Sequence, residues 1–200
     1  MKITILYDNI ANPGLKSGWG FSCLVDSGQK ILFDTGDSAE KLLYNFEKLN
    51  IDPRNVDKVV LSHNHWDHVD GLEGFRKLNH KAEVIYPKAF SQLTEISTGV
   101  YSTGALGELI KEQALVVKAE KGNIVITGCA HPGLEIILKA AGQLGAIFGV
   151  LGGFHGFSKL DELEGIQLIG PCHCTQYKQQ IKERYPGEFK DIKAGSVVEI

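Results

Sequence analysis

The sequence predicts an α/β fold, a four-layer αββα sandwich of two mixed β-sheets with helices on the outer faces. Three observations lead to this prediction. Short strand-like runs alternate with helix-like patterns, each half of the chain begins with a hairpin-like pair of strands, and several later runs end in a tight loop with a histidine. No low-complexity tract or linker interrupts the 200 residues, so we expect a single domain spanning 1–200.

The first half contains five strand-like runs and two helix-like segments. A tight Ser27-Gly28 turn joins the second and third runs as a hairpin. The first helix is predicted from apolar residues at helical spacing behind Ser38, which is suited to the N-cap position. The expected strands span 2–8, 21–28, 30–36, 58–63 and 82–87, and the expected helices span 38–50 and 71–78.

The second half repeats this order of strand, tight loop and histidine. Two strand-like runs surround a Lys121-Gly122-Asn123 turn, and the second of them leads to His131. Two further apolar runs lead to His155 and His173. The expected strands lie within 114–131, 145–156, 166–174 and 195–200, and the expected helices within 131–143 and 177–186.

The composition indicates a soluble globular protein and argues against several partner classes. With a net charge of −3 and no basic stripe, the chain has no feature that favours nucleic acid or an anionic membrane. No apolar run approaches the roughly 20 residues of a membrane span. The first residues, MKITILYDNI, lack the apolar region and cleavage site of a signal peptide. We therefore expect a cytoplasmic protein.

Four cysteines are too few for a disulfide scaffold at this length, so we interpret them as reduced thiols. Cys172 and Cys174 flank His173. On an extended chain both would point away from that histidine, and we do not count them as ligands.

Residues 61–71 read LSHNHWDHVDG and hold four ligand-type side chains within six positions. His63 and His65 are two residues apart at an expected strand end, where side chains at i and i+2 point the same way. Both imidazoles can therefore face one metal ion. Asp67 and His68 follow where the chain turns back, and they suit a neighbouring ion. Imidazole with carboxylate is a ligand set for zinc, and also for iron or manganese.

The competing interpretation is a chance cluster of histidines on an exposed loop. The aspartate at a spacing that makes a second pocket counts against it. So do the three further histidines at similar strand ends downstream. His80, in the loop KLNHKAE, lacks such a context, and we interpret it as a surface residue.

HNHWDH matches the H-x-H-x-D-H signature of the metallo-β-lactamase superfamily, and the resemblance covers nearly the whole chain. FDTG at 33–36 resembles the family's strand-end Asp-Thr-Gly turn. TGCAHPG and GPCHC supply histidines where the family places its remaining ligands. GCAHPG, GGFH and PCHCT together resemble a subgroup of dihydropterin–aminobenzene ribofuranosyl-phosphate synthases, linked to methanopterin assembly.

The resemblance implies a metallo-β-lactamase-like domain with a binuclear metal site. The implied ligands are His63, His65 and His131 for the first metal and Asp67, His68 and His173 for the second. Many family members bridge the two ions with an aspartate, but the matching stretch, GVLGGFH, offers none. His155 stands in that place. Three interpretations stay open. His155 helps to bind the second metal, His155 faces substrate, or the second metal site is weak because it lacks the bridging aspartate.

Other residues near the motifs have two interpretations each. Asp34 orients a metal-binding histidine or caps a tight turn. Cys129 lies near the metal or is a small buried thiol. Gly152 and Gly153 let substrate or phosphate approach the backbone, or they permit a sharp turn. Trp66 forms the base of a substrate pocket or packs in the core.

A metal at such a site lowers the pKa of bound water to about 7 and polarises a carbonyl or phosphoryl oxygen. We therefore expect an enzyme that uses one or two ions, zinc or alternatively iron or manganese, to hydrolyse an ester, lactone, amide or phosphoester of a small molecule. The resemblance suggests that Asp67 both ligates and guides the proton.

Two other functions stay open. The subgroup resemblance implies a pterin-linked transferase, in which an aromatic nucleophile displaces pyrophosphate from a pterin methyl group. A non-catalytic metal-binding sensor or partner protein is the other. A flavin-dependent diiron protein fits less well, because such relatives carry an acidic residue where His65 stands. The chain is short for the family, which suggests the hypothesis that a partner subunit, in a homo-oligomer, closes the substrate pocket.

Overall fold

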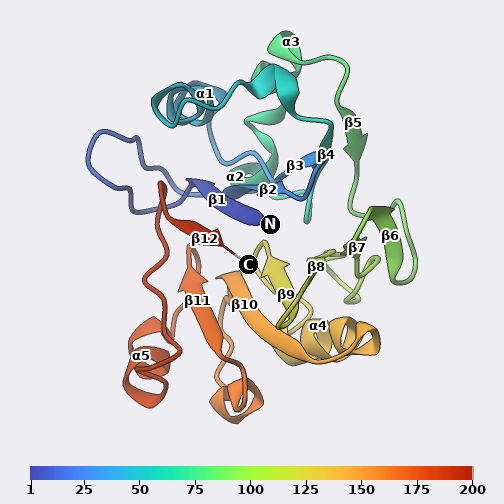
Figure 1. Cartoon of the computed structure of the whole chain (residues 1–200), viewed down its shortest axis with the longest axis vertical. Helices are drawn as coiled ribbons and strands as arrows, with labels where there is room; N and C mark the ends of the chain where they lie inside the picture. The colour runs from blue at the N-terminus through green and yellow to red at the C-terminus, as the bar shows by residue number, and fades with distance from the viewer. Residues whose placement is uncertain (200) are drawn as a thin grey trace. The chain divides into compact units, whose positions relative to one another are not determined.

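The computed structural model describes residues 1–199, which form two compact units (Figure 1). The first unit comprises Met1–Pro87 and Lys193–Ile200, of which residue 200 is not described, and the second comprises Lys88–Ile192. Each unit contains one six-stranded sheet. The predicted α/β class with two mixed sheets is confirmed, while the expected single domain over 1–200 stays a prediction.

The sheet of the first unit has the strand order β12-β1-β2-β3-β4-β5. β12, β1, β2 and β3 pair antiparallel, and β3, β4 and β5 pair parallel. Its strands are β1 (Lys2–Tyr7), β2 (Ser22–Asp26), β3 (Lys30–Phe33), β4 (Lys58–Val60), β5 (Glu83–Ile85) and β12 (Val197–Glu199). The predicted hairpin of the second and third runs is therefore confirmed, and the last strand of the chain pairs with the first.

Helices cover one face of this sheet. They are α1 (Ala39–Lys48), the 3-10 turn η1 (Pro53–Asn55), α2 (Trp66–Val69) and α3 (Leu72–Leu78). Ser38 caps α1 as predicted, because its side chain accepts a hydrogen bond from the backbone N–H of Lys41. Phe46 of α1 and Phe75 of α3 are fully buried in one cluster with Val59 of β4. This packing fixes the start of the α2–α3 segment against the sheet.

The sheet of the second unit has the order β11-β10-β9-β8-β7-β6. β9, β10 and β11 pair parallel, and the remaining pairs are antiparallel. Its strands are β6 (Thr94–Ser97), β7 (Val100–Ser102), β8 (Leu115–Ala119), β9 (Gly122–Thr127), β10 (Ile147–Gly153) and β11 (Leu168–Cys172). The β6–β7 hairpin was not predicted, because its short strands carry only a weak apolar pattern, TEIS and VYS.

Two helices and two 3-10 turns accompany the second sheet. They are α4 (Leu134–Ala141), η2 (Gly142–Leu144), η3 (Leu160–Leu163) and α5 (Lys178–Arg184). Ile137 of α4 and Ile181 of α5 are fully buried in one cluster with Val150 of β10. Both predicted helices of this half are confirmed.

The predicted site residues lie just beyond the ends of parallel strands in each unit. Asp34 follows β3, and the motif begins three residues after β4. In the second unit His131, His155 and His173 follow β9, β10 and β11. The carboxyl ends of adjacent parallel strands lie at one edge of a sheet, which gathers residues from distant parts of the sequence. The expected strand 58–63 is shorter than predicted, since it ends at Val60.

Among the described residues, no helix has both the length and the apolar character that crossing a membrane requires.

Candidate metal centre

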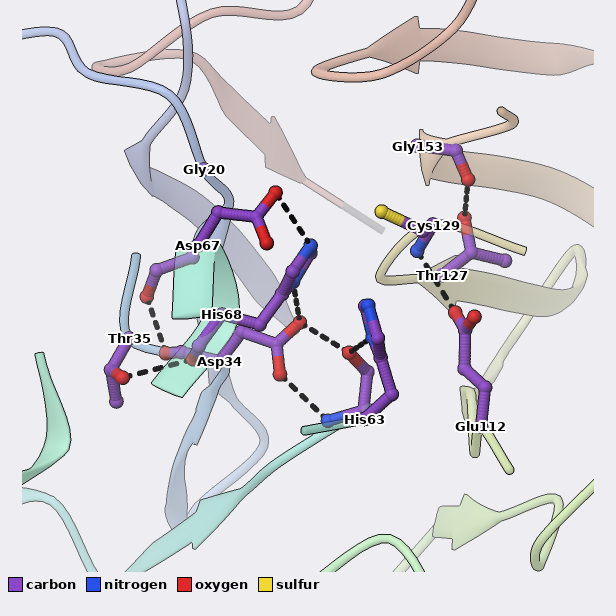
Figure 2. Close-up of polar contacts among 12 residues, drawn as sticks. Gly20, Asp34, Thr35, His63, Asp67, His68, Glu112, Thr127, Cys129 and Gly153 are labelled. Carbon is purple, nitrogen blue, oxygen red and sulfur yellow. Dashed lines mark hydrogen bonds and ion pairs between the residues drawn. The ribbon is translucent and has the colours of Figure 1, made fainter. Parts of the chain in front are cut away.

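Asp34 is the centre of a buried hydrogen-bond network in the first unit (Figure 2). Ser62 donates its backbone N–H to Asp34 Oδ1 at 2.6 Å and its hydroxyl to Asp34 Oδ2 at 2.7 Å. His68 Nδ1 lies 2.7 Å from the same Oδ2, and His63 Nδ1 lies 2.9 Å from the Ser62 hydroxyl oxygen. One carboxylate thereby orients two of the predicted metal ligands.

This network determines where the two imidazoles carry their protons. A carboxylate only accepts hydrogen bonds, so His68 donates from Nδ1 to Asp34. The single Ser62 hydroxyl proton points to Asp34, so His63 in turn donates from Nδ1 to Ser62. In its neutral form each ring would then carry its lone pair on Nε2. Histidines that bind metals through one nitrogen usually donate from the other in this way.

His65 and Asp67 extend from the same segment. His65 is the N-cap residue of α2, and its ring centroid lies 4.5 Å from that of His63. Ligand-type atoms of these two histidines lie within 4.8 Å of each other. Asp67, which is buried in the first turn of α2, places Oδ2 3.7 Å from Nε2 of His68. The structure thus brings His63 together with His65 and Asp67 together with His68.

The turn that follows Asp34 ties it to α2. Asp34 has a left-handed backbone with φ 56°. The backbone N–H and the hydroxyl of Thr35 both donate to the carbonyl oxygen of His68, at 2.8 and 2.9 Å. Gly71 permits this approach, because a Cβ atom there would lie 2.1 Å from the carbonyl oxygen of Thr35. The Asp-Thr-Gly turn therefore positions both the side chain and the backbone of His68.

In the second unit a buried carboxylate fixes the loop that carries Cys129 and His131. Glu112 has no exposed surface, and its oxygens accept three backbone N–H groups at 2.8 to 2.9 Å. Figure 2 shows the one from Cys129. The donors are Cys129, Ala130 and His131. Ala130 has a left-handed backbone with φ 60°. Glu112 thus holds this loop in a conformation that an alanine rarely adopts.

His131 and His155 lie side by side, with ring centroids 4.8 Å apart. A pocket of about 250 Å³ opens beside them. Its lining includes Phe157, Ser158 and Lys159, and Lys159 forms an ion pair with Glu135 at 2.7 Å. This hydrogen bond with Lys159 lowers the pKa of Glu135. The pocket combines a pair of imidazoles with an apolar wall and a charged rim.

Cys129, His173 and Cys174 form a cluster of sulfur and nitrogen donors. Cys129 Sγ lies within 4.8 Å of a ring nitrogen of His173. Cys174 Sγ donates to the carbonyl oxygen of Cys129 at 3.8 Å. Hydrogen bonding with the Cys129 side chain is the main cause that lowers the pKa of Cys174 to about 5, and His173 and His155 lower it further. The extended backbone expected around His173 is wrong, because its φ is 49°.

Two other predicted residues have clear positions. A Cβ atom at Gly153 would lie 2.3 Å from the carbonyl oxygen of Gly128 and 2.8 Å from Cys174 Sγ. The space beside Gly153 is therefore filled by the chain itself. Trp66 is 54% exposed, which excludes a core-packing role for it.

Sequence reasoning missed Ser62 and Glu112. Ser62 lies inside the quoted motif stretch, where a hydroxyl next to the first histidine was a usable signal. Glu112 lies in a segment without periodic pattern, 17 to 19 residues before its partners. The signal available was an acidic residue directly before a buried apolar strand.

Comparisons with known proteins agree with this geometry. The sequence profile of the metallo-β-lactamase superfamily matches residues 20–106. The solved structure of Tm1679, described as a metal-dependent hydrolase of the β-lactamase superfamily, is 29% identical, with a TM-score of 0.82 over 100% of this chain and 99% of that one. Residues 20–106 thus match the metallo-β-lactamase superfamily, and the fold of the chain matches a hydrolase described as one of its members.

A relative within the superfamily is the 7,8-dihydropterin-6-methyl-4-(β-D-ribofuranosyl)-aminobenzene-5′-phosphate synthase of Methanocaldococcus jannaschii. It is 26% identical, and the match covers 85% of this chain and 84% of that protein. Ribonuclease Z of Ligilactobacillus salivarius is 32% identical over 49% of this chain and 34% of its own. These relatives are enzymes by name, and the expectation that this chain is an enzyme is confirmed.

The residues of this site fit a metal ion. His63 and His68 each hydrogen-bond through Nδ1, so Nε2 is the ring nitrogen that would bind an ion, and Asp67 lies beside His68. Histidine and carboxylate donors suit a divalent transition metal. The superfamily is metal-dependent, and these groups could hold the ion.

Proposed function

We propose that this protein is a metal-dependent hydrolase that cleaves an ester, lactone or phosphoester bond in a small molecule. The Asp34 network carries the proposal, because it holds His63 and His68 through Nδ1 and so orients both rings as ligands. A bound zinc, iron or manganese ion would supply an activated water and polarise the oxygen of the scissile group.

The protein's own residues then have distinct tasks. Asp34 keeps the Nδ1 protons of both histidines in place and so prevents the rings from turning over. Asp67, buried beside His68, would bind the metal and accept the proton of the attacking water. We assign His131 to the first ion, with His63 and His65. We assign His173 to the second, with Asp67 and His68.

The pocket beside His131 and His155 supports a small substrate. Its volume of about 250 Å³ is near the lower end for ligand pockets. Phe157 offers an apolar wall, and Lys159 offers a positive charge to an anionic substituent. We therefore place His155 on the substrate side of the site, next to His131. Either one copy of the chain forms the whole pocket, or a second copy in a homo-oligomer closes it. A single monomeric peak in light scattering of the active enzyme would exclude the second alternative.

Metal content and activity, measured on the same samples, test the proposal. Protein purified without added metal should contain one or two ions per chain by elemental analysis. With metal added, it should hydrolyse generic phosphodiester or lactone substrates. His63→Ala should lose metal and activity together, and His80→Ala should retain both. Full metal occupancy in His63→Ala would disprove the assignment of the first site.

A pterin-linked transferase is the second candidate, favoured by the match to the M. jannaschii synthase. In that reaction the bond from a pterin methyl carbon to diphosphate breaks. A new bond from this carbon to the amine nitrogen of an aminobenzene forms, and that nitrogen loses a proton. A bound metal would stabilise the departing diphosphate. A protein that binds a pterin, contains metal and leaves the hydrolase substrates intact would favour this candidate over hydrolysis.

A further inference from the structure

We infer that the Cys129 thiolate is a metal ligand beside His173, in addition to the nitrogen and oxygen ligands that the sequence indicates. This inference rests on the proposed metal-dependent function and specifies the composition of one of its sites. Cys129 is 3% exposed and lies after β9, while His173 lies after β11. Two segments far apart in the sequence thus bring a sulfur and a nitrogen donor within 4.8 Å of each other.

The loop geometry directs the thiol toward this role. Glu112 accepts the backbone N–H groups of Cys129, Ala130 and His131, which holds three consecutive residues on one carboxylate. Figure 2 shows the Cys129 sulfur on the side of its residue away from Glu112. The left-handed backbone of Ala130 separates Cys129 from His131, so the loop is not a regular strand there. A rigid loop lowers the entropy cost of placing a ligand.

The neighbouring thiol is engaged differently. Cys174 Sγ lies 3.8 Å from the carbonyl oxygen of Cys129. It also lies against Gly153, where a Cβ atom would be 2.8 Å away. These contacts hold Cys174 against the backbone of the Cys129 loop. We therefore assign Cys174 as a positioning residue and Cys129 as the ligand.

The chemistry of sulfur distinguishes this site from one of nitrogen and oxygen alone. Thiolate binds zinc strongly and favours zinc over manganese, which prefers oxygen ligands. A thiolate also adds a negative charge, which reduces the Lewis acidity of the bound ion. We expect the site that contains Cys129 to bind zinc or cobalt in preference to manganese.

Cobalt substitution tests the inference with a readout independent of activity. Metal-free protein loaded with Co²⁺ should show thiolate-to-cobalt charge-transfer absorption in the near ultraviolet. Cys129→Ser should lose this absorption and keep ligand-field bands in the visible range, with zinc affinity at one site reduced by more than about 10-fold. Cys172→Ser is the matched control, since Cys172 is also buried and also adjoins His173. It should keep the wild-type spectrum.

The other outcomes have definite meanings. Charge transfer that persists in Cys129→Ser and disappears in Cys174→Ser would overturn the assignment. Ligand-field bands without charge transfer in the wild type would overturn it and leave the proposed metal-dependent function standing. Failure of the wild type to bind Co²⁺ would contradict both. X-ray absorption of the zinc-loaded wild type needs no variant, and it should show a sulfur neighbour at about 2.3 Å.

Discussion

Four residues at the strand ends have a left-handed backbone although none of them is glycine. They are Asp34, Ala130, His155 and His173, with φ between 46° and 60°. Each such residue costs on the order of 1–3 kcal/mol, and it persists only where surrounding contacts hold it. Three of them are predicted site residues, and the fourth separates Cys129 from His131. The strain is therefore concentrated where the chain must turn side chains out of the strand direction.

Asp34→Asn tests whether the carboxylate, rather than the shape of the turn, prepares the histidines. Asparagine keeps the size but presents an NH₂ group where a second acceptor oxygen stood, so one of the three hydrogen bonds is lost. We expect zinc affinity to fall by about 10- to 100-fold. Zinc competition with a chromophoric chelator measures this.

Asp26→Asn is the matched control, because Asp26 lies at the end of β2, half-exposed, and forms an ion pair with Lys30. Its zinc affinity should equal that of the wild type. Unchanged affinity in Asp34→Asn would reduce Asp34 to a residue that caps the turn.

At the scale of elements, α2 and α3 are placed by one close backbone contact. Gly71→Ala would put a Cβ atom 2.1 Å from the carbonyl oxygen of Thr35, the residue that also binds the carbonyl of His68. We expect a loss of stability of about 1–3 kcal/mol, together with weaker metal binding. Urea unfolding and zinc titration measure the two effects.

Gly142→Ala is the control for this substitution. Gly142 ends α4 with φ −60°, and no atom lies within 4 Å of the position its Cβ would take. It should be neutral or stabilising by up to about 1 kcal/mol. Equal stability of the two variants would show that the Thr35 contact yields without cost.

The loop after β9 depends on Glu112 in the same way. Glu112→Gln leaves one acceptor oxygen for three backbone N–H groups and turns a donor toward them. We expect about 1.5–3 kcal/mol of lost stability, with faster hydrogen exchange at Cys129 and His131. Glu108→Gln, at an exposed position of the same segment, should change neither. Wild-type exchange rates in Glu112→Gln would show that the loop keeps its conformation without the carboxylate.

The elements that the sequence predicted are those with strong local patterns. The amphipathic spacing behind Ser38 predicted α1, and the apolar runs predicted β9, β10 and β11. The β6–β7 hairpin has no such pattern, since only Val100 and Ser102 of the residues in its two strands are buried. The Asp34 network joins residues 28 and 34 positions apart, and Glu112 reaches 17 to 19 positions forward. Such contacts follow from strand pairing, which a local pattern does not reveal.

At the scale of the whole molecule, each unit repeats one arrangement. Adjacent parallel strands, β3 and β4 in the first sheet and β9, β10 and β11 in the second, carry the predicted site residues beyond their carboxyl ends. The order of strand, tight loop and histidine was visible in the sequence because each strand is short and apolar. Which residues share a metal was not visible, and the ligand sets are proposals that draw on both halves of the chain.

Metal-dependent stability tests whether both halves supply ligands. A metal that binds only the folded protein adds about 2.7 kcal/mol at 100 times its dissociation constant, so chelated protein should unfold at a lower temperature than zinc-loaded protein. His63→Ala and His131→Ala should each lose most of this zinc-induced gain, because each removes a proposed ligand of the first ion. His80→Ala should keep all of it, since His80 lies outside both ligand sets. Differential scanning calorimetry with and without chelator gives the three shifts. If His131→Ala retained the full gain, the first ion would be held by the motif of residues 63–68 alone, and His131 would belong to the substrate pocket with His155.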